Sequence, residues 1–308
     1  MDEIKADSAY FIKLGRKGKW EEECILQDNT IKLGFINPLH SECLAGEWNK
    51  ISKYWLREGK KKGKATEITN QIKTFYERNE KTLWITFFRR KMYWCFAKKN
   101  VTLEKDGTRT RKVIDGWKHQ DIKGSQLTIE NLSGKLTKVQ GFQGTICSVK
   151  EFDYLIRKLN NQKLPEVQET EKTLKTLLQN IEPLIQNLTW KDFELLSDLI
   201  FTHAGWQRIS TRGKTEKSID LVLMSPVTGD QVFVQVKSKS NMATLKKCIK
   251  DYESMKEEFS QMYFVVHTTD KSLIEWQDKD DIKLWDVRKL SNLVVDSGLI
   301  SWLIKKVS

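Results

Sequence analysis

Ile219-Asp220-Leu221-Val222-Leu223 and, a short way downstream, Val234-Gln235-Val236-Lys237 are the stretches that decide the fold of this chain. Both runs have the length and the branched aliphatic residues of β-strands. The segment between them, Ser225 to Asp230 (SPVTGD), has the composition of a turn, so the two runs predict a β-hairpin. Asp220 is a carboxylate among aliphatic neighbours, which is costly to bury unless it is paired or binds a metal.

The second strand of this hairpin carries two polar side chains. Gln235 and Lys237 are two residues apart, so they point to the same face of an extended strand and can converge with Asp220. Hydrolysis of a phosphodiester needs a divalent metal on oxygen ligands, a positioned water and a nearby cation, and these residue types can supply them. In the simpler alternative, Asp220 caps a turn or pairs with a lysine, and Gln235 and Lys237 occupy the solvent side of the strand.

Helices and further strands surround the hairpin in a clear order. A helix is predicted from Trp190 to Ala204, where Gly205 stops it, and a final helix runs from Leu290 to about Lys305. Between them lie predicted strands at 206–211, 218–224, 231–237, 261–267 and 282–285, a helix at 243–259 and a short helical piece near 271–277. This order predicts an α/β domain in which helices flank a mixed sheet.

The last third of the chain resembles the Mrr-like branch of the PD-(D/E)XK restriction-endonuclease superfamily. The residues that carry the resemblance are Phe193-Glu194-Leu195-Leu196 before Gly205-Trp206, Ile219-Asp220-Leu221, Gln235-Val236-Lys237, and Leu284-Trp285-Asp286 before the closing helix. The resemblance implies a restriction-endonuclease-like fold and Mg²⁺-dependent cleavage of DNA.

Carried over residue by residue, the resemblance implies Asp220 as a metal ligand and Gln235 in the position of the second ligand. Lys237 would face the phosphate and orient the water, and Glu194 would be an outer acidic helper. The chain departs from the family's glycine-rich, acidic approach to the first Asp, because it has Gly213 to Ser218 (GKTEKS) there. Gln235 is neutral, so the metal would hold fewer negative ligands and would bind weakly without DNA.

The first half of the chain has a different pattern, of short β-prone runs with turn residues between them. The runs lie at 10–14, 30–35, 83–88, 92–98, 126–129 and 145–149, and a helix is predicted at 66–77. We expect a separate β-rich, barrel-like domain at residues 1–160, a helical linker at 161–188 that packs on one domain or self-associates, and the nuclease domain at 189–308.

Positive charge is concentrated in this first half. Residues 1–150 hold 30 Lys and Arg against 18 Asp and Glu, whereas residues 151–308 hold 23 of each, so the first part carries the whole net charge of +12. Such a surplus attracts polyanions, and nucleic acid is the commonest such partner. Candidate phosphate contacts are Lys60, Lys61, Lys62, Lys64, Arg89, Arg90 and Lys91, with Arg212 and Lys239 beside the hairpin. Each of these could equally be a solvated surface residue.

Aromatic residues of the first half suggest a means of recognition. A base flipped out of a duplex is held by stacking on aromatic rings, and Trp84, Tyr93, Trp94 and Trp117 are the candidates. The alternative is that most of these rings are core packing. The region is similar to PUA-type β-barrels of the kind found in EVE and related readers of modified bases.

Cellular context is suggested by the cysteines and the N-terminus. The five cysteines are widely spaced and form no C-x-x-C pair, as expected of buried thiols in a reducing cytoplasm. The N-terminus has no secretory signal, and no run approaches the roughly 20 apolar residues of a membrane span.

The sequence therefore predicts a Mg²⁺-dependent DNA endonuclease that restricts foreign DNA carrying modified bases. Its partner would be double-stranded DNA, and it could act as a homodimer. Two alternatives stay open: a structure-specific repair nuclease, and a non-catalytic DNA-binding protein that kept the nuclease fold.

Overall fold

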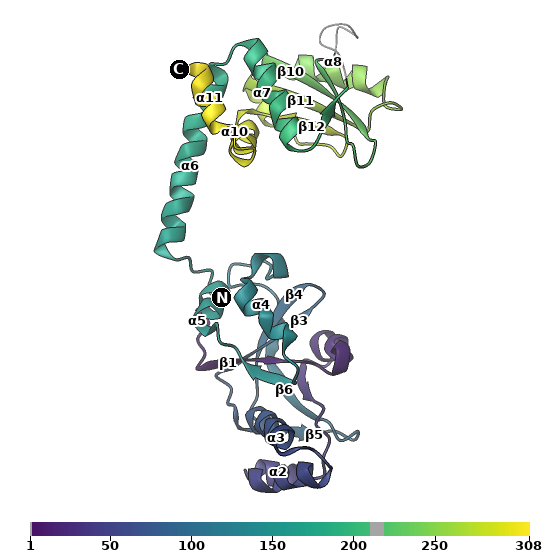
Figure 1. Ribbon diagram of the computed structural model, residues 1–308, viewed down its shortest axis with the longest axis vertical. Coiled ribbons are helices and arrows are strands. Elements are labelled where there is room, and N and C mark those ends of the chain that lie inside the picture. The colour runs from purple at the N-terminus through teal and green to yellow at the C-terminus, as the bar shows by residue number, and fades with distance from the viewer. Residues whose placement is uncertain (1, 210–218) are drawn as a thin grey trace. The chain divides into compact units, whose positions relative to one another are not determined.

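The computed structural model describes residues 2–209 and 219–308, and the chain forms two compact units, Met1–Leu164 and Pro165–Ser308 (Figure 1). Each unit has its own sheet and its own hydrophobic core. None of the helices described is both long enough and apolar enough to cross a membrane.

The N-terminal unit is built on a seven-stranded sheet with the order β2-β6-β4-β3-β1-β7, in which β5 pairs with β6. The strands are β1 (Ser8–Ile12), β2 (Thr30–Leu33), β3 (Thr82–Phe88), β4 (Lys91–Ala97), β5 (Thr102–Leu103), β6 (Arg109–Lys118) and β7 (Ile146–Ser148). The pairing of β1 with β3 is parallel and the other pairings are antiparallel. The expected barrel-like form is found in part: the sheet curls into a half-barrel, which stays open because, in the described residues, its edge strands β2 and β7 do not pair with each other.

Helices of this unit lie on both faces of the sheet. They are α1 (His40–Leu44), α2 (Trp48–Arg57), α3 (Lys62–Glu77), α4 (Gly134–Thr137) and α5 (Phe152–Leu159), with short 3₁₀ or π turns at Arg16–Gly18, Glu23–Gln27, Ile129–Asn131 and Lys138–Gly141. Trp84 on β3 packs with Phe75 of α3, while its neighbour Leu83 packs with Leu155 of α5 on the other face. Because successive residues of a strand face opposite sides, β3 is buried from both directions.

Two arginines on β6 are fully buried, with no exposed surface. Arg109 donates hydrogen bonds to the carbonyls of Phe35, Gly107 and Asn37, and Arg111 donates to those of Lys98, Phe75 and Ala97. No carboxylate lies within 4 Å of either guanidinium in the part of the chain that the structure describes. Burial lowers the pKa of Arg111 to about 10.

Two local predictions for this unit differ from the structure. The helix predicted at 66–77 begins earlier, at Lys62. The run 126–129 was expected to be a strand, but it forms only two isolated bridges, from Gln126 to Gln120 and from Thr128 to Lys91, before a 3₁₀ turn. Leu127 is fully buried in the core there, and its backbone is bonded to His119 and Met92, so tertiary packing holds this segment without a regular strand.

The C-terminal unit has a mixed five-stranded sheet flanked by helices, as predicted. Its order is β12-β11-β10-β9-β8, with strands β8 (Gln207–Arg208), β9 (Leu221–Met224), β10 (Gln231–Ser240), β11 (Gln261–Thr269) and β12 (Ile282–Trp285). The β8–β9–β10 pairings are antiparallel, and β10–β11–β12 are parallel.

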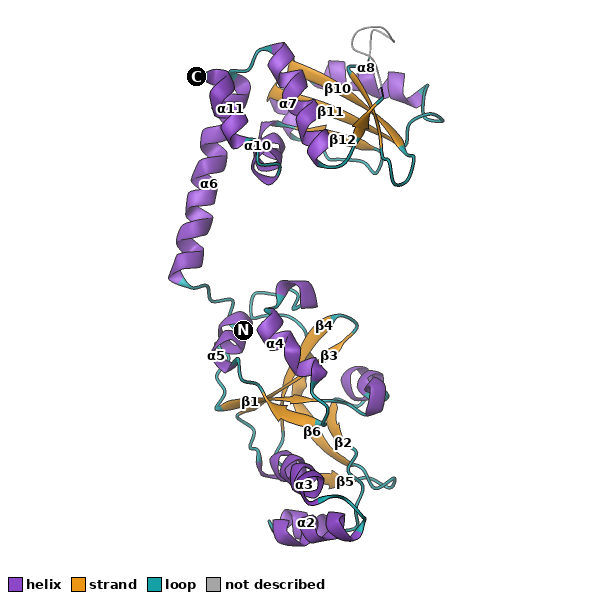
Figure 2. Cartoon of the chain, viewed as in Figure 1, coloured by secondary structure: helices purple, strands orange, loops and turns teal. Residues whose placement is uncertain are grey.

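Helices cover both faces of this sheet (Figure 2). They are α6 (Pro165–Gln186), α7 (Trp190–His203), α8 (Met242–Glu253), α9 (Lys271–Ile274), α10 (Val287–Asp296) and α11 (Ile300–Val307). Val234 on β10 belongs to the core formed with residues of α6, α7, α10 and α11, whereas Phe233 belongs to the core with residues of α8 on the other face. The single closing helix that was predicted is divided into α10 and α11 at Gly298, which has a φ of 67°. All five cysteines are free.

Candidate active site

The register between β9 and β10 places Asp220. Leu221 pairs with Val234, and the backbone N–H of Asp220 donates to the Val234 carbonyl at 3.2 Å, which carries the pairing one residue beyond β9. Asp220 therefore lies at the start of β9, directly beside the Gln235 to Lys237 segment of β10.

Three donors from β10 converge on one oxygen of Asp220. Oδ2 accepts the backbone N–H of Val236 at 2.7 Å, the side-chain amide N–H of Gln235, and the Lys237 ammonium at 3.5 Å. The structure thus brings together the three residues that the sequence predicted to converge. The second carboxylate oxygen, Oδ1, has no such set of donors in the described residues.

The site is buried at Gln235 and exposed to solvent at the Lys237 ammonium. Gln235 is 2% exposed, whereas the Lys237 side chain is 39% exposed. Because β10 alternates, Val234 and Val236 face the core beneath α7, and Gln235 and Lys237 face the side covered by α8. The Lys237 ammonium is therefore accessible from solvent while it lies 3.5 Å from Asp220 Oδ2.

Cys248 of α8 borders this site and is buried. Burial raises the pKa of its thiol, although the nearby Lys237 acts in the opposite direction. A protonated, buried thiol is a poor nucleophile, so Cys248 is a packing residue here.

The groups that this site could offer to a metal ion are the oxygen atoms of Asp220 and Gln235. The described residues hold no group of three or more His, Cys, Asp or Glu side chains placed to bind an ion. Asp220 and the Gln235 amide oxygen are hard ligands of the kind that Mg²⁺ prefers. The Gln235 amide turns its nitrogen toward Asp220, so it must rotate by half a turn to present its oxygen. With that rotation the donor set fits a hard cation.

Glu194, the predicted outer helper, is half-buried on α7. This helix covers the face of β10 opposite to Gln235 and Lys237, so the role of Glu194 stays a prediction. Lys239 is exposed on β10 and shares the face of Lys237, where a DNA strand could reach it. Arg212 lies outside the described residues.

The basic cluster consists of Lys60, Lys61, Lys62 and Lys64, and all four side chains are exposed. Lys62 and Lys64 lie in the first turn of α3, and Lys64 forms an ion pair with Glu67 at 2.9 Å. Cations at a helix N-terminus oppose the helix dipole. This placement therefore costs stability to the folded chain.

Arg89 and Arg90 form the two-residue turn between β3 and β4, and Lys91 is the first residue of β4. Both arginines have left-handed backbone conformations, with φ of 47° and 61°. Such a turn normally takes Asn and Gly, because other residues are strained there. Arg89 pairs with Glu22 at 3.3 Å and Arg90 pairs with Glu130, yet both side chains remain mostly exposed.

The aromatic candidates lie mainly inside the N-terminal unit. Trp84 is fully buried, Trp94 is 2% exposed and Tyr93 is 9% exposed. Trp117 is half-buried, and its indole N–H donates to the Thr30 carbonyl. An open base-stacking surface at Trp84 or Trp94 is thus not present; these two rings are core packing, the alternative that strand alternation favoured.

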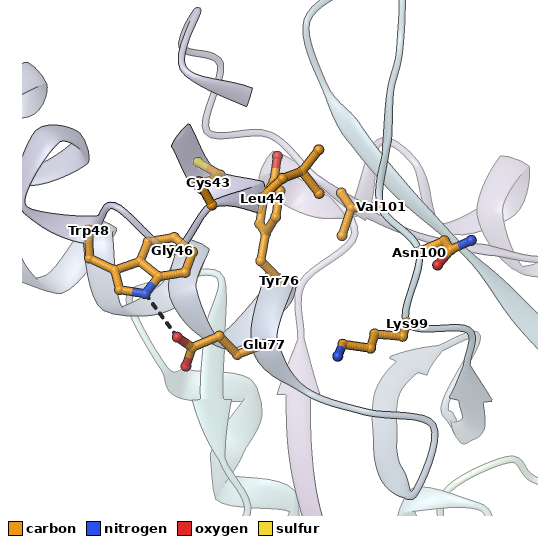
Figure 3. Close-up of a pocket in the computed structure, with 10 residues that line it drawn as sticks. Cys43, Leu44, Gly46, Trp48, Tyr76, Glu77, Lys99, Asn100 and Val101 are labelled. Atoms are coloured by element: carbon orange, nitrogen blue, oxygen red, sulfur yellow. Dashed lines mark hydrogen bonds between the residues drawn. The ribbon is translucent and has the colours of Figure 1, made fainter. Parts of the chain in front are cut away.

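One hollow on this unit was not foreseen. It has a volume of about 520 Å³ and lies among the end of α1, Trp48, Tyr76, Glu77 and the loop after β4 (Figure 3). These segments are far apart in the sequence, so no local pattern could have revealed it.

Comparison with known proteins bears on the C-terminal unit. Residues 185–294 match the model of the Mrr catalytic domain family, described as "Restriction endonuclease", and this range contains the whole Asp220, Gln235 and Lys237 site. The C-terminal unit carries a restriction endonuclease domain.

A solved structure also resembles this chain, the crystal structure of a repair endonuclease from Pyrococcus abyssi. The identity is 10%, the TM-score is 0.24, and the alignment covers 66% of this chain. It spans 63% of the other chain, less than two thirds of its length. No match was found among curated proteins. The restriction endonuclease domain makes DNA the substrate class to consider.

Proposed function

We propose that this protein is a Mg²⁺-dependent DNA endonuclease whose active site is centred on Asp220, Gln235 and Lys237. The observation that carries the proposal is the convergence of all three side chains at one carboxylate oxygen, within a domain that matches restriction endonucleases. A carboxylate, an amide oxygen and an ammonium on neighbouring strands are the groups that phosphodiester hydrolysis needs.

The three residues divide the work. Asp220 and, after its amide turns, Gln235 would hold Mg²⁺, which supplies Lewis acidity toward the phosphate and toward a bound water. Lys237, partly exposed and 3.5 Å from Asp220, offsets the negative charge that develops on the phosphate and orients the attacking water. Removal of Asp220 would also leave the Val236 N–H without its acceptor.

The N-terminal part supplies affinity for the polyanion. The whole excess of 12 positive charges lies in residues 1–150, and two linked modules raise each other's local concentration on one DNA molecule. We further propose that this unit selects DNA with modified bases, so that the enzyme restricts foreign DNA. Positive charge gives affinity without selectivity, so a base-reading surface is required in addition.

The test compares two lysines of the C-terminal unit, one inside the candidate site and one outside it. Lys237→Ala should abolish Mg²⁺-dependent cleavage of phage DNA while leaving DNA binding within about twofold of wild type, because Lys237 acts on the scissile phosphate. Lys305→Ala removes the same charge from an exposed residue of α11, which packs on the opposite face of the sheet, and it should keep most of the cleavage rate. Cleavage by purified Lys237→Ala at the wild-type rate would remove this residue from the active site.

A further inference from the structure

The hollow on the N-terminal unit has the size and the lining of a ligand site. Its volume of about 520 Å³ falls within the roughly 300–1,000 Å³ of small-molecule pockets. Figure 3 shows Trp48 and Glu77 on one side of it, Leu44 and Tyr76 at its centre, and Lys99 extending from the opposite side. All of these residues belong to one unit, so the hollow does not depend on how the two units are arranged.

The aromatic wall of this hollow is held in place while still reachable. Trp48 is half-buried, and its indole N–H donates to Glu77 Oε1 at 2.8 Å. Its ring also meets Tyr76 edge to face, with 6.3 Å between the centroids. Trp48 thus differs from Trp84 and Trp94, which the core encloses, because part of its ring remains available for stacking.

A buried cation lies directly behind this wall. Arg109 is fully buried, and its Nε donates to the Tyr76 hydroxyl at 3.2 Å, which in turn contacts His40 Nδ1 at 2.7 Å. Burial raises the pKa of Tyr76 to about 12, so the hydroxyl stays neutral and does not offset the guanidinium. The guanidinium of Arg109 is bonded to carbonyl, amide and hydroxyl oxygens, with no carboxylate within 4 Å in the described residues, so an uncompensated positive charge lies behind Tyr76.

The rim adds one more cation and two hydrogen-bonding groups. Lys99 is exposed, and no carboxylate lies within 4 Å of its ammonium in the described chain. Glu77 is 48% exposed and so keeps acceptor capacity beyond its bonds to Trp48 and Lys73. Asn100 on the same rim is exposed and offers both a donor and an acceptor.

We propose that this hollow holds one nucleotide that has left the DNA stack, with cytosine or adenine as its base. The base stacks on Trp48, its amine donates to Glu77, and its phosphate lies beside Lys99. A carboxylate accepts from the N4 amine of cytosine or the N6 amine of adenine. At the corresponding position thymine and guanine carry a carbonyl oxygen, which a carboxylate repels, so Glu77 selects among bases. This inference rests on the proposed function in one respect, that DNA is the substrate.

The test measures by fluorescence anisotropy how tightly the full-length protein binds labelled duplexes. EDTA is present to prevent cleavage. Three duplexes differ at one position, which is a bulged cytosine, a bulged thymine or fully paired. Wild type should bind the cytosine bulge about tenfold more tightly than the other two. Trp48→Ala should lose this preference, and Trp48→Phe, which keeps a ring, should retain most of it.

A matched pair of lysines tests the phosphate contact. Lys99→Ala should weaken binding of the cytosine bulge, whereas Lys98→Ala, an equal charge change at the neighbouring exposed residue outside the hollow, should not. Equal losses for the two lysines, or equal binding of all three duplexes by wild type, would overturn the proposal. Melting temperatures of the variants report whether each one folds, and Lys99→Ala leaves the core untouched.

Failure of this inference can be told apart from failure of the proposed function. If the wild-type protein cleaves DNA with Mg²⁺ but shows no cytosine preference, nucleotide binding in the hollow is refuted and the proposed nuclease function stands. If the protein cleaves no DNA but shows a cytosine preference that Trp48→Ala removes, nucleotide binding in the hollow stands and the proposed nuclease function is refuted.

Discussion

The Asp220 carboxylate and the Val236 backbone N–H are joined by a hydrogen bond of 2.7 Å between β9 and β10. Because the donor belongs to the main chain of a central strand, the position of the carboxylate is set by the sheet and not by a flexible side chain. Gln235 and Lys237 leave the backbone on either side of Val236, so this single contact aligns the whole candidate site. Sites built on strands in this way are held more precisely than sites on loops.

Gln235→Glu should strengthen the binding of Mg²⁺ at the proposed site. Without metal, the new carboxylate would stand beside Asp220 in place of a hydrogen-bonding amide, so the melting temperature should fall. Added Mg²⁺ should restore it, because two carboxylates bind the cation better than one. The measurement is a thermal melt in EDTA and in Mg²⁺. If Mg²⁺ raises the melting temperature of Gln235→Glu no more than that of wild type, the assignment of Gln235 to the metal position is contradicted.

Arg90→Gly and Arg90→Ala should separate backbone strain from charge. Glycine accepts the φ of 61° without strain, so Arg90→Gly should raise the free energy of unfolding by about 1 kcal/mol, whereas Arg90→Ala should not. The exposed pair with Glu130 contributes little to stability. Both variants should bind DNA more weakly, since both lose the same charge. Urea unfolding and a binding titration measure the two effects, and unchanged DNA affinity in both variants would exclude this turn from the interface.

The two units should differ in the salt dependence of DNA binding. Residues 1–164 hold the positive excess, so this fragment should bind DNA with an affinity that falls steeply as salt rises. Residues 165–308 should bind weakly, with a shallow dependence. The check is a salt titration of each fragment alone. Similar slopes for the two would show that charge in the first half does not serve DNA binding.

Stability should fall as the pH drops below about 6.5, the ordinary pKa of histidine. Burial, and next the charge of Lys239, lowers the pKa of His267, and burial is also the main cause for His40 and His119. The unfolded chain therefore takes up protons before the folded chain does, and acid favours unfolding. Protonated His267 would also carry a buried Nε2–H with no acceptor in the described residues.

Melting temperatures measured between about pH 7.5 and pH 5.5 check this dependence. The variant His267→Gln should flatten it, whereas His203→Gln, a change at an exposed histidine, should not. If the melting temperatures of His267→Gln and wild type fall equally with pH, His267 does not contribute to the pH dependence of stability.

The candidate site was predictable because its geometry is local. Alternation along one strand places Gln235 and Lys237 on one face, and a short turn brings Asp220 beside them. The orientation of the Gln235 amide was not predictable, since it depends on which of its atoms meets the carboxylate.

Aromatic residues of the N-terminal unit show where prediction from sequence failed. Trp84 and Trp94 lie on strands that are packed from both faces, and only the tertiary fold shows that neither face is left to solvent. Trp48, which was not singled out, lies beside Tyr76 because α1, α2 and α3 pack together. Contacts between segments so distant along the chain leave no periodic signal in the sequence.

The buried arginines of β6 have a consequence for how the N-terminal unit unfolds. Arg109 relies on carbonyls near residue 35 and Arg111 on those of Phe75 and Ala97, so segments from three parts of the chain must be in place together. A half-formed unit would enclose a guanidinium with nothing to accept its protons, at a cost of several kcal/mol. Partly folded states are thereby penalised, and this unit should melt in a single cooperative transition, with fluorescence and circular dichroism changing at the same temperature.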